Sequence, residues 1–219
     1  MKNLIKAYCL FLAATILIGC GEEEYVYPDL ITEMVCLKTN AEGFGTQIVT
    51  DEGKVWHLRE GNQPNSLTTD SIYRVVCRYA PQTPSEGTSL EATAYSFLSV
   101  IAPIPLPTTS FEAIYTDPVS IQSIWRSGDY LNMILNIKIK EKGSKLAFIE
   151  DGISTGDDGK QTLSLTLFHN RNNDIEGFDQ KYYLSVPLWH YHNILQKGDA
   201  IVFNLNTYKE GMTSRIFTY

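Results

Sequence analysis

From Leu30 to its last residue, the chain is a succession of short β-prone segments separated by turns rich in glycine, proline and aspartate. Hydrophobic periodicity of the helical kind is weak throughout. A single hairpin is only marginally stable in water, so strands of this length must assemble into sheets with several members. The pattern therefore predicts an all-β protein.

Five strand candidates fill the first half, within residues 30–102. The first three form a meander, and Asp51-Glu52-Gly53 has the composition of a hairpin turn between two of them. Five strands that begin with such a meander are typical of the OB-fold, a small barrel. We therefore expect an OB-like barrel built from Leu30–Thr39, Phe44–Thr50, Lys54–Leu58, Ser71–Tyr79 and Leu90–Ile101.

Prolines at positions 103, 105 and 107 separate the two halves. Because proline cannot donate to a sheet ladder, residues 103–114 are predicted to form an extended linker. Residues 115–219 then hold about seven strand candidates, the number of an immunoglobulin-like β-sandwich. Pro187–Leu195 is the only short helical candidate among them. The strand candidates are 119–126, 130–140, 146–150, 161–169, 181–186, 200–208 and 213–219.

The N-terminus has the pattern of a bacterial lipoprotein signal. Two lysines precede an apolar run at 7–18, which is too short to cross a bilayer as a helix. Leu-Ile-Gly-Cys at 17–20 then predicts cleavage before Cys20, whose sulfur would carry a diacylglyceryl group and whose amine would take another acyl chain, such as palmitate. Acyl chains contribute about 0.8 kcal/mol per buried methylene, so they give a stable anchor. We expect a signal peptide at 1–19 and an acidic tether at 20–29.

Charge and composition limit the partners. The net charge is −7 and becomes −9 once Lys2 and Lys6 leave with the signal. No Lys/Arg cluster offers the basic face that nucleic-acid binding needs, so we exclude nucleic acid as a partner. The expected partners are the membrane, through the lipid anchor, and an unidentified protein or glycan.

Two cysteines remain in the mature chain, Cys36 and Cys77. They could form one disulfide in an oxidising envelope or lie buried as two small apolar residues. Both lie in strand-like runs, which favours burial, and their spacing alone does not decide between the two states.

The segment Ile124–Asn132, with the sequence Ile-Trp-Arg-Ser-Gly-Asp-Tyr-Leu-Asn, resembles the NigD-like lipoproteins of Bacteroidetes. Leu167–Asn170, Asn172–Asp174 and the hairpin at Asp51–Gly53 fit the same family. The resemblance covers the mature chain and implies an N-terminal OB-like domain followed by a C-terminal β-sandwich. It carries no catalytic residues. The family name comes from a gene near a bacteriocin locus, which suggests a bacteriocin-associated or immunity-type role.

The same resemblance bears on the cellular address. Glu22, Glu23 and Glu24 follow Cys20 directly and resemble the surface-export signal of Bacteroidetes lipoproteins. The alternative is a solvated tether without a signalling role. We expect an outer-membrane lipoprotein, exposed at the cell surface.

Aromatic residues are the candidate binding groups. Trp125 and Tyr130 flank a Ser-Gly-Asp turn, and Trp189 and Tyr191 form a second pair. Exposed rings of this kind could bind sugars or a protein, whereas buried rings would belong to the core. Asn132 and the turn aspartate are expected to fix the turn through side-chain-to-backbone hydrogen bonds.

His190 and His192 are the candidate metal ligands, because residues i and i+2 of an extended backbone share a face. The alternative is a pair of half-exposed histidines. Acidic residues between Glu150 and Asp158 could hold calcium or simply form turns. His169 could act in acid–base chemistry, but no nucleophile motif accompanies it. We expect no cofactor and no enzymatic activity, with binding or assembly as the role and glycan binding as the alternative.

Overall fold

The computed structural model describes residues 28–61, 63–82 and 89–219. The predicted signal peptide and the lipidation site Cys20 lie outside these ranges. Within the described residues, no helix is long and apolar enough to cross a membrane. Strands make up most of the described chain, which confirms the all-β class.

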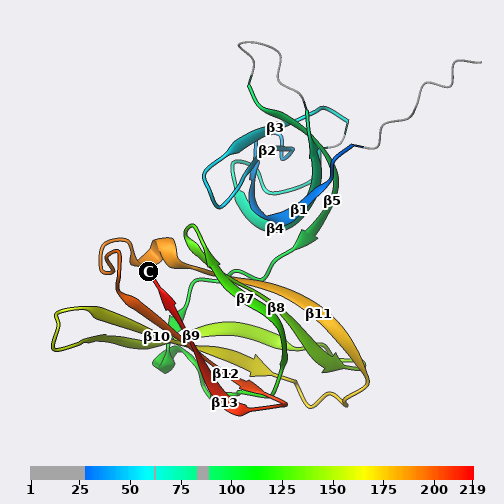
Figure 1. The fold of residues 1–219 in the computed structure, drawn as a ribbon. Coiled ribbons are helices and arrows are strands. Elements are labelled where there is room, and N and C mark those ends of the chain that lie inside the picture. The colour runs from blue at the N-terminus through cyan, green and yellow to red at the C-terminus, as the bar shows by residue number, and fades with distance from the viewer. Residues whose placement is uncertain (1–27, 62, 83–88) are drawn as a thin grey trace, which may run out of the picture.

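The N-terminal domain is a closed five-stranded barrel (Figure 1). The strands follow the order β1-β2-β3-β5-β4, with β1 closing antiparallel on β4 and β3 pairing in parallel with β5. This meander-first topology is the OB-like barrel predicted from the sequence. The strands are β1 (Ile31–Thr39), β2 (Gly45–Val49), β3 (Val55–Leu58), β4 (Ile72–Pro81) and β5 (Glu91–Ser99).

The barrel core contains Val35, Leu37 and Ile48 together with the rings of Trp56 and Tyr79, whose centroids lie 6.0 Å apart. Tyr79 donates its hydroxyl hydrogen bond to Glu33 at 2.6 Å. Burial, followed by that contact, raises the pKa of Tyr79.

The C-terminal domain is a sandwich of two sheets, as predicted. A five-stranded sheet has the order β13-β12-β10-β9-β6, and a three-stranded sheet has the order β11-β8-β7. Apolar side chains from both sheets, among them Leu135, Phe148 and Phe203, fill one core. The elements are β6 (Leu106–Pro107), η2 (Thr108–Ser110), β7 (Ser120–Ser127), β8 (Tyr130–Ile139), β9 (Lys145–Thr155), β10 (Gln161–Asn170), β11 (Phe178–Pro187), η3 (Leu188–Tyr191), β12 (Ala200–Thr207) and β13 (Gly211–Thr218).

Residues 103–114, predicted as a linker, are instead part of the sandwich. Leu106 lies opposite Ile149 in a short parallel pairing of β6 with β9. Prolines are tolerated here because β6 is an edge strand. Phe111 then stacks on Phe168 with ring centroids 5.0 Å apart. The linker prediction was wrong because edge pairing and ring stacking fix this segment.

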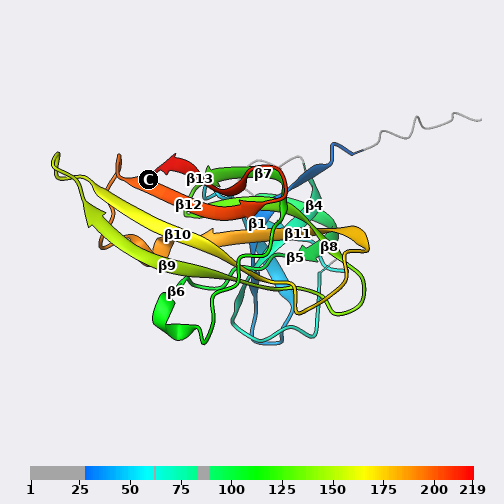
Figure 2. The same cartoon turned by 90° about the horizontal axis from the view of Figure 1, so that it is seen from below.

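The barrel joins the sandwich without a spacer. Ile101 donates its backbone N–H to the carbonyl of Tyr183 at 2.9 Å and accepts from Ser185 at 3.0 Å, so the chain leaving β5 runs along β11. Figure 1 shows the barrel on the outward side of β7, β8 and β11. Seen from below, the five-stranded sheet covers the other side of the sandwich (Figure 2).

Alternation in β8 explains why the barrel sits there. Leu131 and Met133 point into the sandwich core and are fully buried. Neighbours on a strand face opposite sides, so Asn132 and Ile134 point out of the sandwich, toward the barrel. Asn132 is nevertheless fully buried, which shows that the outward face of this sheet is a domain interface.

Candidate functional site

A buried ion pair forms the centre of the domain interface. Arg74 of β4 binds both carboxylate oxygens of Asp51, which lies in the turn between β2 and β3. Nη1 lies 2.6 Å from Oδ1 and Nη2 lies 2.8 Å from Oδ2. The side chains are 3% and 9% exposed. A two-pronged pair of this kind fixes geometry as well as charge.

Two side chains of the sandwich complete this pair. Asn132 accepts from Arg74 at 2.9 Å and donates to Asp51 at 3.0 Å. Ser185 of β11 donates to Asn132 at 2.5 Å and accepts from Arg74 Nε at 3.2 Å. We call these four residues the interface network. It holds the barrel and the sandwich in one arrangement.

The two hairpin turns also touch. A Cβ built on Gly128 would lie 2.3 Å from the carbonyl oxygen of Asp51, and Gly128 has a φ of +51°. The family-like segment Ile124–Asn132 and the hairpin at Asp51–Gly53 therefore pack on each other. Asp129 and Asn132 do not fix their own turn as predicted, because Asn132 joins the network and Asp129 pairs with His192 at 2.9 Å.

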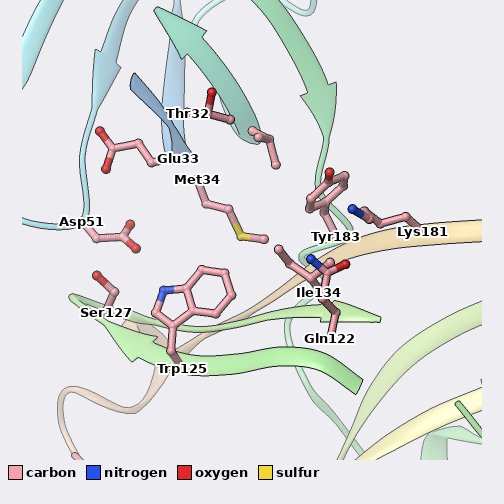
Figure 3. A pocket seen from close by; sticks show the side chains of 11 residues that line it. Thr32, Glu33, Met34, Asp51, Gln122, Trp125, Ser127, Ile134, Lys181 and Tyr183 are labelled. Atoms are coloured by element: carbon pink, nitrogen blue, oxygen red, sulfur yellow. The ribbon is translucent and has the colours of Figure 1, made fainter. Parts of the chain in front are cut away.

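A cleft of about 350 Å³ lies beside the network, between the two domains (Figure 3). The indole ring of Trp125 points into it from β7. We call it the Trp125 cleft. Its lining residues are Thr32, Glu33, Met34, Asp51 and Val76 of the barrel and Gln122, Trp125, Ser127, Ile134, Lys181 and Tyr183 of the sandwich.

Several polar groups of this cleft have no protein partner. Among the described residues, no side-chain hydrogen bond or ion pair is made by Gln122, Trp125, Ser127 or Lys181. Met34, Ile134 and Val76 supply apolar surface beside them. Apolar walls with a few convergent polar groups are typical of small-molecule sites. The Trp125 cleft is therefore the candidate functional site.

A second cleft, of about 390 Å³, shares only Asp51 with the first among its lining residues. Trp189, which is 43% exposed, and Tyr130 line it. The guanidinium of Arg74 lies 3.8 Å from the centre of the Tyr130 ring, whose hydroxyl is 3.2 Å from Cys36 Sγ. Burial, and then the Cys36 contact, raise the pKa of Tyr130.

The four aromatic residues predicted to bind a ligand do not share one site. Trp125 lines the first cleft, while Tyr130 and Trp189 line the second. Tyr191 is 1% exposed and donates its hydroxyl hydrogen bond to Glu150 at 2.7 Å. The prediction of Tyr191 as a binding surface was wrong, because η3 turns this ring into the sandwich core.

The candidate metal ligands do not lie on a strand. His190 is in η3 and His192 follows it, so the shared-face argument for an extended backbone does not apply. His192 pairs with Asp129, and His190 packs edge-on against the rings of Trp189 and Tyr191. Within the described ranges, no group of three or more His, Cys, Asp or Glu residues could hold a metal ion.

The acidic residues between Glu150 and Asp158 are dispersed. Asp151 accepts from Thr166 at 2.6 Å, and Glu150 accepts from Tyr191. Asp158 belongs to the turn between β9 and β10, where it accepts from the backbone of Lys160. Asp158 thus lies in a turn, as the alternative to calcium expected, whereas Glu150 and Asp151 lie within β9.

Both cysteines are free thiols. Cys36 lies opposite Arg74 in the β1–β4 ladder, whereas Cys77 lies opposite Glu33. The two thiols therefore point to opposite faces, Cys36 to the interface and Cys77 into the barrel core. Burial raises the pKa of Cys77 to about 12.

His169 is fully buried, and its ring nitrogens lie 2.8 Å from the Asp117 carbonyl and 2.9 Å from Ser144 Oγ. The roles of Ser144, Arg74 and Ser185 do not follow from the local sequence around them, because their partners are distant in the chain. β4 contains two arginines, and the apolar residues Val75 and Val76 that follow Arg74 are the one available signal for it, because a charge buried in such a run needs a partner.

Comparisons with known proteins agree with this architecture. A sequence model of the NigD-like C-terminal β-sandwich domain matches residues 102–219. No curated protein matches the chain. Among solved structures, a NigD-like immunity protein from Bacteroides caccae is 30% identical, with a TM-score of 0.68, and the match covers 89% of this chain and 99% of that one. A protein of unknown function from Bacteroides vulgatus is 19% identical, with 87% and 91% covered and a TM-score of 0.68, and shows the fold alone. The chain belongs to the NigD-like family.

Proposed function

We propose that this protein is a lipid-anchored, non-enzymatic binding protein of the outer membrane, exposed at the cell surface, whose ligand occupies the Trp125 cleft. One observation carries the proposal: the interface network fixes two domains around a cleft whose polar groups the protein leaves unpaired. Fixed walls favour binding because little conformational freedom is lost when a ligand enters.

The lipid anchor rests on the sequence at 17–20. Cells fed labelled palmitate should incorporate the label into the wild-type chain and into a Cys36→Ala control. Cys20→Ala should lose it. Labelling that persists in Cys20→Ala, or never occurs, contradicts the anchor.

The cleft is tested in living cells with a photo-crosslinking amino acid at Gln122, an exposed lining position. Met212 on β13 is the matched control, because it is 58% exposed and lies outside both clefts. We expect an adduct from position 122 that is absent from position 212 and lost when Trp125→Ala is added. Equal adducts at both positions, or adducts indifferent to Trp125, contradict binding in the cleft.

A second candidate function is an immunity-type role, in which the protein binds a toxin. The Bacteroides caccae relative, 30% identical, is described as an immunity protein. Under this alternative, the adduct at position 122 is a toxin, and deletion of this gene sensitises cells to that toxin. Unchanged toxin sensitivity of the deletion strain contradicts the immunity role.

A further inference from the structure

The Trp125 cleft presents an aromatic ring beside unpaired polar groups. Figure 3 shows the indole ring projecting from β7 below Met34, with Gln122 and Ser127 on either side along the same strand. An aromatic face packs well against the C–H face of a sugar ring, and hydroxyl and amide groups beside it bind the sugar hydroxyls. A volume of about 350 Å³ is near the small end of ligand sites and suits a short saccharide.

The three charged residues that line the cleft differ in their pairing. Asp51 is paired with Arg74 in the interface network. Glu33 lies opposite Cys77 in the β1–β4 ladder, so its side chain faces the barrel core, where the hydroxyl of Tyr79 binds it at 2.6 Å. Lys181 of β11 makes no ion pair with any described residue. In Figure 3 the carboxylate of Glu33 points away from Trp125. Lys181 is therefore the charged side chain with which a ligand beside Trp125 can pair.

Hydrogen-bond donors outnumber pure acceptors on these walls. The indole N–H of Trp125 and the ammonium of Lys181 only donate, while the groups of Gln122 and Ser127 donate and accept. A ligand that satisfies them is rich in acceptor oxygens and carries one negative group. A uronic acid, which is a sugar with a carboxylate, meets both conditions.

We propose that the Trp125 cleft binds a short saccharide containing a uronic acid residue. The sugar ring packs on Trp125, its carboxylate pairs with Lys181, and its hydroxyls bind the polar groups of Gln122 and Ser127. This inference rests on the binding function proposed above and names the class of its ligand.

Calorimetry tests it with the full-length chain in mild detergent. The probes are disaccharides that contain glucuronic or galacturonic acid, each with its neutral counterpart. We expect the acidic probes to bind more tightly. Lys181→Met should weaken them about two- to fivefold, and Trp125→Ala should weaken both kinds about three- to tenfold. Controls are Lys209→Met and Trp189→Ala, which alter an exposed lysine and a tryptophan outside this cleft.

Gln122→Ala, an exposed substitution, provides a readout if Trp125→Ala does not fold; it should weaken both kinds of probe. Equal binding of acidic and neutral probes, or an indifferent Lys181→Met, overturns the uronic acid assignment. If no disaccharide binds while crosslinking at position 122 still captures a Trp125-dependent adduct, this inference fails and the proposed function stands. If neither occurs, both fail.

Discussion

Arg74 of the barrel and Asn132 of the sandwich meet 2.9 Å apart in a site closed to solvent. A guanidinium only donates and a carboxylate only accepts, so the amide of Asn132 must direct its oxygen to Arg74 and its nitrogen to Asp51. Asn132 thus matches a donor and an acceptor of the other domain simultaneously. No apolar side chain can do this, and aspartate would repel Asp51.

Replacing Asn132 should loosen the two domains. Asn132→Ala leaves buried groups of Arg74 and Ser185 without their partner, which costs about 1–3 kcal/mol of unfolding free energy. Urea denaturation followed by tryptophan fluorescence measures this loss. Asn136→Ala is the control, because Asn136 lies on the same face of β8 without a side-chain hydrogen bond to any described residue, and should change stability by less than about 0.5 kcal/mol. Equal losses in the two variants contradict the network.

Replacing Arg74 should lower the free energy of unfolding by more than replacing Asn132 does. Arg74→Met leaves the carboxylate of Asp51 buried and unpaired, which destabilises by about 3–5 kcal/mol. Asp51→Asn removes this unpaired negative charge, so the double variant Arg74→Met/Asp51→Asn should be more stable than Arg74→Met alone. Arg59→Met serves as the control, since the Arg59–Glu91 pair is exposed and contributes at most about 1 kcal/mol. A double variant less stable than Arg74→Met argues against a buried charge.

Two glycine variants distinguish the effect of close packing between the hairpin turns from the effect of a positive φ. Gly128 and Gly53 both have positive φ, but only at Gly128 would a Cβ collide with another segment. Gly53→Ala should therefore cost about 1–2 kcal/mol from strain alone. Gly128→Ala should cost about 1–3 kcal/mol more, because the two turns must separate. Equal melting temperatures for the two variants contradict close packing of the turns.

His169 should make the sandwich acid-sensitive. Burial lowers its pKa in the folded state below the ordinary value near 6.5. Below pH 6.5 the unfolded chain therefore binds more protons, so the contribution of neutral His169 is fully present above that pH and declines as the pH falls. Unfolding free energies measured from pH 7.5 to 5 should fall more steeply for wild type than for His169→Gln. The control His57→Gln alters an exposed histidine and should follow wild type.

Local patterns predicted the elements, whereas the interface depended on distant residues. Alternation and turn composition located the strands of both domains because these signals come from neighbours in the chain. Alternation in β8 also predicts that Asn132 lies on the other face of the strand from Leu131 and Met133. It does not predict whether this outer face contacts water or another domain. The linker prediction for residues 103–114 failed for a similar reason, because Leu106 pairs with Ile149, which is distant in the sequence.

Asp174 should add a second acid transition at lower pH. The backbone N–H groups of Lys140, Lys142, Glu141 and Ile175 donate to its carboxylate and lower its pKa to about 2. A depressed carboxyl pKa stabilises the fold above the ordinary value near 3.8, and this stability is lost as the pH falls toward 2.

Asp174→Asn should lower the melting temperature at pH 6 and remove part of its decline between pH 4 and 2. Asp179→Asn, at an exposed position on β11, is the control and should keep the wild-type decline. If Asp174→Asn melts at the same temperature as wild type at pH 6, the negative charge of Asp174 does not stabilise the loop through these backbone N–H groups. The link between the loop after β8 and the loop before β11 would then need another cause.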